Sequence, residues 1–149
     1  MVNLGVTRAA LRDLLATAEE QVHVDGFVGP GHVSTIIGSD AFAPSAKQYG
    51  KPIVIAGFEP IDLLSAILHL VEQLNAGLAE VQNDFVRAVS PSGNQRAQAL
   101  ISQVLELRDT FEWRGLGPIP HSALRLRPEY SAFDAELRHA RTATTSGQR

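Results

Sequence analysis

The sequence predicts an α/β fold, a three-layer Rossmann-like unit with a short, mostly parallel sheet, followed by an irregular C-terminal extension. Two short apolar runs, at 21–28 and 52–56, each end at a glycine-containing turn, which is typical of buried parallel strands. The segments around them carry apolar residues at helical spacing. The resulting order, αβαβαβα, indicates right-handed crossovers that place helices on the sheet.

The first half of the chain is predicted to hold four helices. Residues 7–20 have apolar side chains at helical spacing, with Thr7 able to cap the first free N–H groups. Short helices are expected at 33–37 and 43–49, between the two strands. Pro60 is suited to the first turn of a longer helix that ends at Gly77, and its wide apolar stripe predicts that it is the most buried helix. The stripe consists of Leu63, Leu64, Ile67, Leu68, Leu70, Val71, Leu74 and Leu78.

The second half begins with a predicted third strand at 79–89, in which Arg87 is interpreted as a solvated edge residue. Residues 90–94 form a turn, and Asn94 is expected to cap a strongly amphipathic helix over 97–105. From 107 to 137 aromatic residues alternate with glycine and proline, so this extension either covers the core or once packed against something absent from the chain. These aromatic residues are Phe111, Trp113, Tyr130 and Phe133. We therefore expect a single α/β domain over 1–137 and a disordered tail over 138–149.

Composition excludes several classes of function. The chain has 149 residues and no cysteine, which removes thiol enzymes, iron–sulfur ligation and disulfides. Its net charge of −3 provides no basic surface for nucleic acid, and no segment approaches the ~20 apolar residues that span a bilayer. The histidines show no metal-ligand spacing, so no metal site is expected. A cytoplasmic protein that binds neither nucleic acid nor membrane is the expectation.

Two glycine turns, 29–34 and 57–60, carry the candidate site. Because the carboxyl ends of parallel strands meet at one edge of a sheet, both turns are expected to contribute to one surface. Glycine would allow close approach of a ligand or backbone, while His32 and Glu59 would position polar groups. No catalytic residue is assigned. The candidate binding residues are Gly29, Gly31, His32, Ser34, Gly57, Phe58, Glu59 and Asp62.

Simpler interpretations of the same residues stay open. His32 and Ser34 could cap the following helix, and Glu59 and Asp62 could complement the positive end of theirs. The first turn also partly imitates a dinucleotide fingerprint, but Pro30 removes a backbone N–H and no acidic residue ends the next strand. A small α/β domain that binds an anion or nucleotide at these turns is the alternative function.

Several motifs together resemble the HypD family of nickel-iron hydrogenase maturation proteins, in the right order over 21–136. The match depends on the whole set, since no single motif is specific. The motifs are Gly26-Phe27-Val28-Gly29-Pro30-Gly31-His32-Val33-Ser34, Pro52-Ile53-Val54-Ile55-Ala56-Gly57-Phe58-Glu59-Pro60-Ile61-Asp62, Arg87-Ala88-Val89 with Gly93-Asn94, and Glu112-Trp113-Arg114-Gly115-Leu116-Gly117.

The resemblance implies a scaffold role in assembly of the iron-cyanide-carbonyl unit, with a HypC-like chaperone and a HypE-like cyanide donor as partners. It implies a longer protein, with two related α/β domains and a cysteine-rich region that holds a [4Fe-4S] cluster. This chain resembles the second α/β domain, with the eight candidate residues facing the interdomain cleft. The family pattern stops after Glu136, where the cysteine-rich continuation should start. A truncated form without independent activity and without a cofactor of its own is therefore expected.

Overall fold

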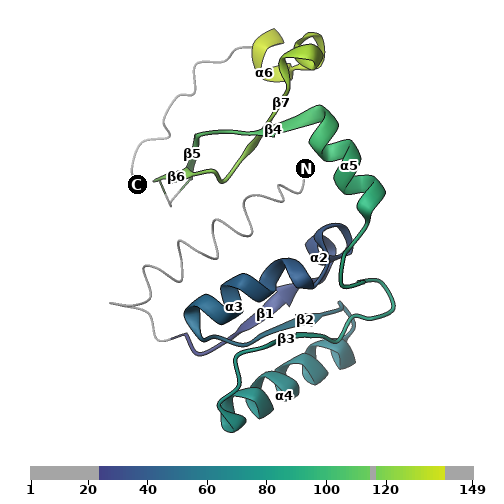
Figure 1. Ribbon diagram of the computed structural model, residues 1–149, viewed down its shortest axis with the longest axis vertical. Helices are drawn as coiled ribbons and strands as arrows, with labels where there is room; N and C mark the ends of the chain where they lie inside the picture. Colours follow the sequence, from purple (N-terminus) through teal and green to yellow (C-terminus); the bar gives the residue numbers. More distant parts are fainter. Residues whose placement is uncertain (1–23, 115–116, 140–149) are drawn as a thin grey trace.

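The computed structural model describes residues 24–114 and 117–139. The helix predicted at 7–20 and most of the tail predicted at 138–149 lie outside these residues. Between Phe27 and Val104 the chain forms a small α/β unit, drawn in Figure 1. Its elements are β1 Phe27–Pro30, α2 Gly31–Ile37, the 3₁₀ helix η1 Asp40–Phe42, α3 Ala43–Tyr49, β2 Ile53–Ala56, α4 Pro60–Ala76, β3 Val81–Asn83 and α5 Gln95–Val104.

The sheet is parallel, in the order β1-β2-β3, with helices on both faces. Ile53 and Ile55 of β2 pack in one cluster with Phe42 and Ala46, from η1 and α3. The alternate residues, Val54 and Ala56, pack on the other face against Ala66 of α4. Figure 1 shows α3 and α4 on opposite sides of the sheet, which confirms the three-layer prediction. No helix among residues 24–114 and 117–139 is long and apolar enough to span a membrane.

The two crossovers have opposite hands, which differs from the prediction. The chain moves in the same direction across the sheet from β1 to β2 and from β2 to β3. The connections lie on opposite faces, however, with α3 between the first two strands and α4 between the last two. Two right-handed crossovers in this strand order would place both connections on one face. One of the two is therefore left-handed, and the expectation of right-handed crossovers throughout was wrong.

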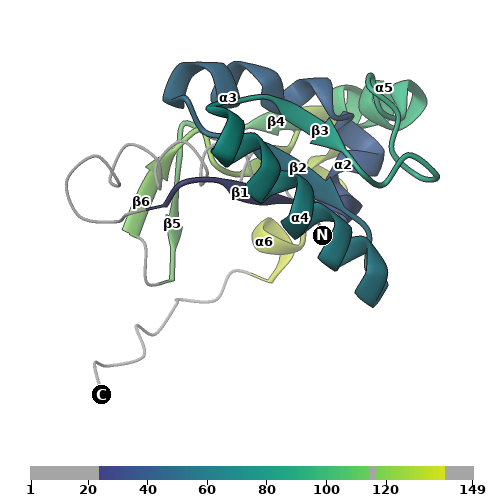
Figure 2. The same ribbon diagram turned by 90° about the horizontal axis from the view of Figure 1, so that it is seen from below.

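The apolar stripe of α4 had predicted that it is the most buried helix. The structure shows that this prediction was wrong. It lies over the sheet in the view from below (Figure 2), but its buried residues are Asp62, Ala66 and Gln73. The leucines and isoleucines of the stripe, among them Leu64 and Leu68, are mostly exposed. Asp62, Gln73 and Ala66 therefore occupy the inward side of α4 with the partly buried Leu70, and the rest of its apolar stripe faces outward.

The third strand is shorter than predicted, because β3 ends at Asn83 and a turn follows it. Phe85 and Val89 then fold back into the core. Asn83 holds this turn, since its side chain accepts a hydrogen bond from the Phe85 backbone N–H and donates one to the Val89 carbonyl oxygen. Arg87 consequently leaves the sheet and reaches the start of α4, where it pairs with a carboxylate, so its interpretation as a solvated edge residue was wrong.

The extension, expected to be irregular, contains two short antiparallel strand pairs. Phe111 and Trp113 pack edge to face with ring centroids 5.0 Å apart, and the Trp113 indole N–H donates to the Ser122 hydroxyl. Phe133 stays exposed. In Figure 1 this part lies away from the sheet and is joined to it through α5. Its elements are β4 Leu105–Leu107 paired with β7 Leu124–Leu126, β5 Thr110–Trp113 paired with β6 Gly117–Pro120, the 3₁₀ helix η2 Pro128–Phe133, and α6 Ala135–Arg138.

Candidate functional site

The two glycine turns lie side by side, as predicted. Pro30, the last residue of β1, pairs in register with Ala56, the last residue of β2. Gly31 and Gly57 therefore leave the same edge of the sheet from adjacent strands. A Cβ atom on Gly31 would lie 2.6 Å from the Ala56 carbonyl oxygen, closer than real Cβ contacts. This position requires glycine because the two backbones approach each other there.

An aromatic stack marks the exposed side of this edge. The rings of His32 and Phe58 have centroids 4.2 Å apart, and Phe58 also meets the buried Phe85 edge to face at 5.7 Å. Although it is a large apolar side chain, Phe58 is 55% exposed. The guanidinium of Arg87 lies 4.6 Å from the centre of the Phe85 ring. Stacked rings and a cation at strand ends can contact a flat or apolar partner group.

Asp62 and Arg87 form an ion pair behind this stack. The Asp62 carboxylate is largely buried, whereas half of the Arg87 side chain is exposed. Two guanidinium nitrogens donate to the two Asp62 oxygens at 2.8 and 2.5 Å, and Glu59 lies 3.8 Å from the same guanidinium. The hydrogen bonds from Arg87 hold the pKa of Asp62 below its usual range and raise that of Arg87. Because both charges are matched, we assign this pair a positioning role.

Asp62 also fixes the start of α4. Its carboxylate accepts a hydrogen bond from the Glu59 backbone N–H at 3.2 Å, and the Glu59 side chain accepts one from the third residue of the helix, which together form a capping box. The interpretation of Glu59 and Asp62 as partners of the helix N-terminus is confirmed. A Cβ atom on Gly57 would lie 2.7 Å from the Phe85 ring and would also overlap the Asp62 carboxylate. Gly57 therefore leaves the space that this carboxylate occupies.

The remaining candidate residues have structural positions. Gly29 lies within β1 and is buried, so the first turn begins later than the sequence indicated. Ser34 is buried, and its hydroxyl donates to the Pro30 carbonyl oxygen at 2.7 Å. Helix α2 has no side-chain cap, which shows that the capping interpretation of His32 and Ser34 was wrong. We define the strand-end surface as His32, Phe58, Glu59, Asp62 and Arg87.

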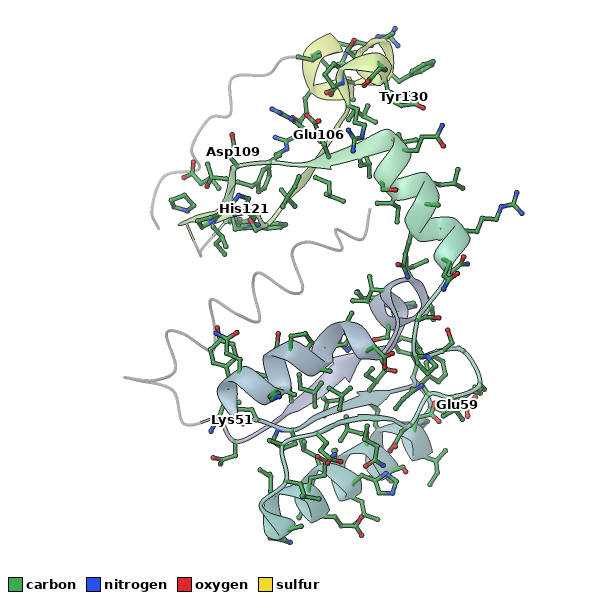
Figure 3. The ribbon with its side chains drawn as sticks, in the orientation of Figure 1. Lys51, Glu59, Glu106, Asp109, His121 and Tyr130 are labelled. Atoms are coloured by element: carbon green, nitrogen blue, oxygen red, sulfur yellow. The ribbon has the colours of Figure 1, made fainter. Side chains whose placement is uncertain are left out.

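Sequence reasoning did not place Arg87 in the site. The pairing with Asp62 spans 25 residues, and it depends on β3 ending early, for which Asn83 and the turn after it are the signal. Arg87 also borders an open hollow of about 810 Å³ next to the strand ends. Figure 3 shows Glu59 at this end of the sheet and Lys51 at the opposite end. Polar residues that line the hollow are Thr35, Ser39, Asn83, Ser90 and Asn94.

The side chains at this edge offer stacking and polar contacts, but the described residues there do not form a group of metal ligands. Within residues 24–114 and 117–139, no three histidine or carboxylate side chains are grouped to hold a metal ion. A [4Fe-4S] cluster requires cysteine thiolates, and the chain has no cysteine, so its residues do not fit that group. The arrangement supports stacking, hydrogen bonding and ion pairing with a partner.

Fold and site together define a small α/β module with exposed aromatic and charged side chains at the ends of its parallel strands. The family model of HypD, described as "Hydrogenase formation hypA family", matches residues 1–149. The chain therefore belongs to the HypD family, as its motifs had indicated.

Relatives from three bacteria are similar to this chain over only part of their own length. It is 57% identical over 141 residues to the hydrogenase maturation factor HypD of Azotobacter vinelandii, which covers 93% of this chain and 37% of that protein. The HypD of Cupriavidus necator is 53% identical over 137 residues, 89% of this chain and 36% of the relative. The HypD of Escherichia coli K12 is 44% identical over 133 residues, 89% and 35% respectively. The chain thus spans little more than a third of the length of these relatives.

Proposed function

We propose that this chain acts in nickel-iron hydrogenase maturation as a binding module that has no catalytic activity of its own. Its membership of a family whose relatives are hydrogenase maturation factors supports the general role. The strand-end surface supports the binding role, because exposed aromatic and charged side chains are gathered there and the described residues hold no group of three metal ligands. The stack of Phe58 on His32 is the observation that carries this proposal.

The partners proposed for this surface are a HypC-like chaperone and a HypE-like cyanide donor. Phe58 offers an apolar contact that is already held in place by His32 and Phe85, so little conformational entropy is lost on binding. Glu59, at the edge of the same surface, is exposed and would orient a basic or N–H group of the partner. Both partners are proposed from the family resemblance, and the cytoplasmic location is proposed from the composition of the sequence.

Assembly of the iron-cyanide-carbonyl unit needs ligands that this chain lacks. The family resemblance assigns iron binding and the [4Fe-4S] cluster to cysteines, and none is present here. In this proposal those groups belong to polypeptide outside this sequence. The module contributes one side of the binding cleft.

Capture of purified partners tests the surface. We expect the immobilised chain to retain HypC-like and HypE-like proteins, and Phe58→Ala to weaken retention about tenfold or more, as removal of a central aromatic anchor does. Phe133→Ala is the matched control, since Phe133 is also exposed but lies in η2 of the extension. Equal retention by the parent chain and both variants would contradict a role for Phe58.

Replacement of the matched part of Azotobacter vinelandii HypD by this chain tests the general role. The chimera is expected to restore hydrogenase activity to cells that lack HypD, and Phe58→Ala in the chimera is expected to reduce it. A folded chimera that restores no activity would remove the maturation proposal.

An anion-binding or nucleotide-binding domain is the second candidate, favoured by the hollow beside Arg87. Two observations weigh against it. Asp62 and Glu59 already occupy the start of α4, and both neutralise Arg87. A thermal-shift screen with nucleotides, phosphate and small carboxylates decides, because a ligand at ~100 times its dissociation constant adds about 2.7 kcal/mol of stability. Absence of any shift would exclude this candidate.

A further inference from the structure

Helix α4 presents a continuous apolar surface to solvent. Leu64 and Leu68, at its centre, are 63% and 56% exposed, and neighbours at helical spacing extend the surface along the whole helix. We call this surface the α4 apolar face. It consists of Ile61, Leu63, Leu64, Ile67, Leu68, Val71, Leu74 and Leu78.

The orientation of α4 is fixed by polar contacts along its inward side. At the first turn Asp62 pairs with Arg87, and in the middle the His69 Nδ1 atom lies 2.6 Å from the Asp84 carboxylate. Near the end, Gln73 Oε1 accepts a hydrogen bond from the Glu80 backbone N–H at 3.1 Å. Rotation of the helix to bury its leucines would break all three contacts and would leave polar groups unpaired. The outward apolar face is therefore a specified feature of this fold.

The sheet has a further exposed apolar side chain on β1, on the face that α4 covers. Val28 pairs in register with Val54, so both side chains point to the face of the sheet that α4 covers. Val54 is fully buried there, whereas Val28 remains 45% exposed. Contiguous apolar surfaces of the extent of the α4 apolar face are rare on monomeric proteins and mark interaction sites.

The chemistry of the helix favours a protein occupant over a membrane. Helix α4 contains no lysine or arginine, and its acidic residues are Asp62 and Glu72. Interfacial membrane helices carry basic residues that are attracted to anionic lipid, so this helix lacks that attraction. An apolar protein surface is the complementary partner.

We infer that the α4 apolar face is the docking surface for the part of a HypD chain that lies outside the matched stretch. The matched 141 residues are 37% of the Azotobacter vinelandii relative, so most of that chain lies elsewhere. None of the elements described here covers the outer side of α4, and in Figure 1 the C-terminal extension lies on the other side of the sheet. The inference rests on family membership and does not require the proposed maturation role.

Thermal unfolding of two proteins tests the inference, namely the isolated chain and the chimera in which it replaces the matched stretch of Azotobacter vinelandii HypD. Leu68→Glu lowers the isolated chain's midpoint by no more than about 4 °C, because Leu68 is more than half exposed there. In the chimera the same change places a charge in an apolar interface and lowers the midpoint by at least about 5 °C. Leu100→Glu is the matched control, since Leu100 on α5 is 54% exposed. It is expected to shift neither midpoint by more than about 4 °C.

Three outcomes would overturn the inference. The first is a Leu68→Glu chimera as stable as its parent, and the second is an equal loss for Leu68→Glu and Leu100→Glu. The third is failure of the unsubstituted chimera to fold. If the α4 apolar face docks on the rest of a HypD chain, the chimera should fold with this chain in place of the matched stretch. Sedimentation of the isolated chain adds an independent measurement. A stable dimer that Leu68→Glu dissociates would assign the face to a second copy and would also overturn the inference.

Discussion

The outward orientation of α4 predicts that one of its central leucines contributes little to the stability of the isolated chain. Leu68→Ala is the informative change, because the sequence pattern alone would place Leu68 in the core. Ile55→Ala is the reference, since Ile55 lies in the middle of β2 and is fully buried. The two substitutions remove similar aliphatic groups from sites that the structure distinguishes sharply.

The expected magnitudes follow from exposure. Leu68 is 56% exposed, so less than half of its side chain leaves water on folding. Since full burial of a leucine contributes about 1.5–3 kcal/mol, its truncation removes roughly 1 kcal/mol. The better helix propensity of alanine offsets a few tenths of that loss, roughly 0.2 kcal/mol. Ile55→Ala leaves a cavity between α3 and the sheet and should cost about 2–5 kcal/mol.

Urea unfolding followed by far-ultraviolet circular dichroism measures both values, at two protein concentrations. A Leu68→Ala loss of less than about 1 kcal/mol beside a loss of at least about 2 kcal/mol for Ile55→Ala supports the structure. A loss at Leu68 equal to that at Ile55 would refute the reasoning, because α4 would then bury its leucines. If the unfolding free energies are the same at both protein concentrations, they belong to the isolated chain and not to an associated form.

Three further predictions concern single residues. The Asp84 hydrogen bond raises the pKa of His69 above 6.5, so the stability from this pair is complete below about pH 6.5 and declines as pH rises through the higher folded value. Urea midpoints of a His69→Gln variant should lack that decline, and parallel pH curves for parent and variant would exclude it. Because Arg87 lowers the pKa of Asp62 below 3.8, the stability from that pair is lost only as pH falls through the still lower folded value. An Asp62→Asn variant should lose less stability at acid pH than the parent chain, as followed by circular dichroism. The same loss in both proteins would contradict a contribution from this pair. Gly31→Ala should lower the free energy of unfolding in urea by about 1–3 kcal/mol, because the new Cβ would be too close to the Ala56 carbonyl oxygen. An unaltered midpoint would show that the backbone of the turn can shift to make room for the Cβ.

The central strand was predictable because its signals are local, whereas β1 begins later than the predicted run 21–28 and β3 is shorter than 79–89. The run 52–56 is apolar throughout and is followed by a glycine, and β2 proved to be the fully buried central strand. The neighbouring positions of Gly31 and Gly57 followed from one rule, that parallel strands place their carboxyl ends at the same edge. The opposite crossover hands did not follow, because the strong general preference for right-handed connections predicts that both lie on one face of the sheet.

The ion pair at the site could not be derived from spacing. Asp62 and Arg87 are 25 residues apart, and a regular third strand through 79–89 would have kept Arg87 in the sheet. The Asn83 side chain decides otherwise, because it satisfies the backbone of Phe85 and Val89 and so favours a turn at that point. Competition between a side chain and the sheet for backbone hydrogen bonds is a tertiary outcome that strand patterning does not reveal.

Hydrophobic periodicity reports which side of a helix is apolar, and it does not say which chain covers that side. For α4 the usual assumption is that the apolar stripe faces the domain's own sheet, and under that assumption Ser65, His69 and Gln73 would lie in solvent. The structure reverses the two sides, because Asp84 and the polar residues near β3 offer partners to the polar stripe. Buried polar groups need hydrogen-bond partners, and the polar stripe of α4 supplies them to Asp84 and to the Glu80 backbone N–H. We infer that contacts beyond these elements cover the leucines opposite that face, in a segment that spans little more than a third of its relatives' length.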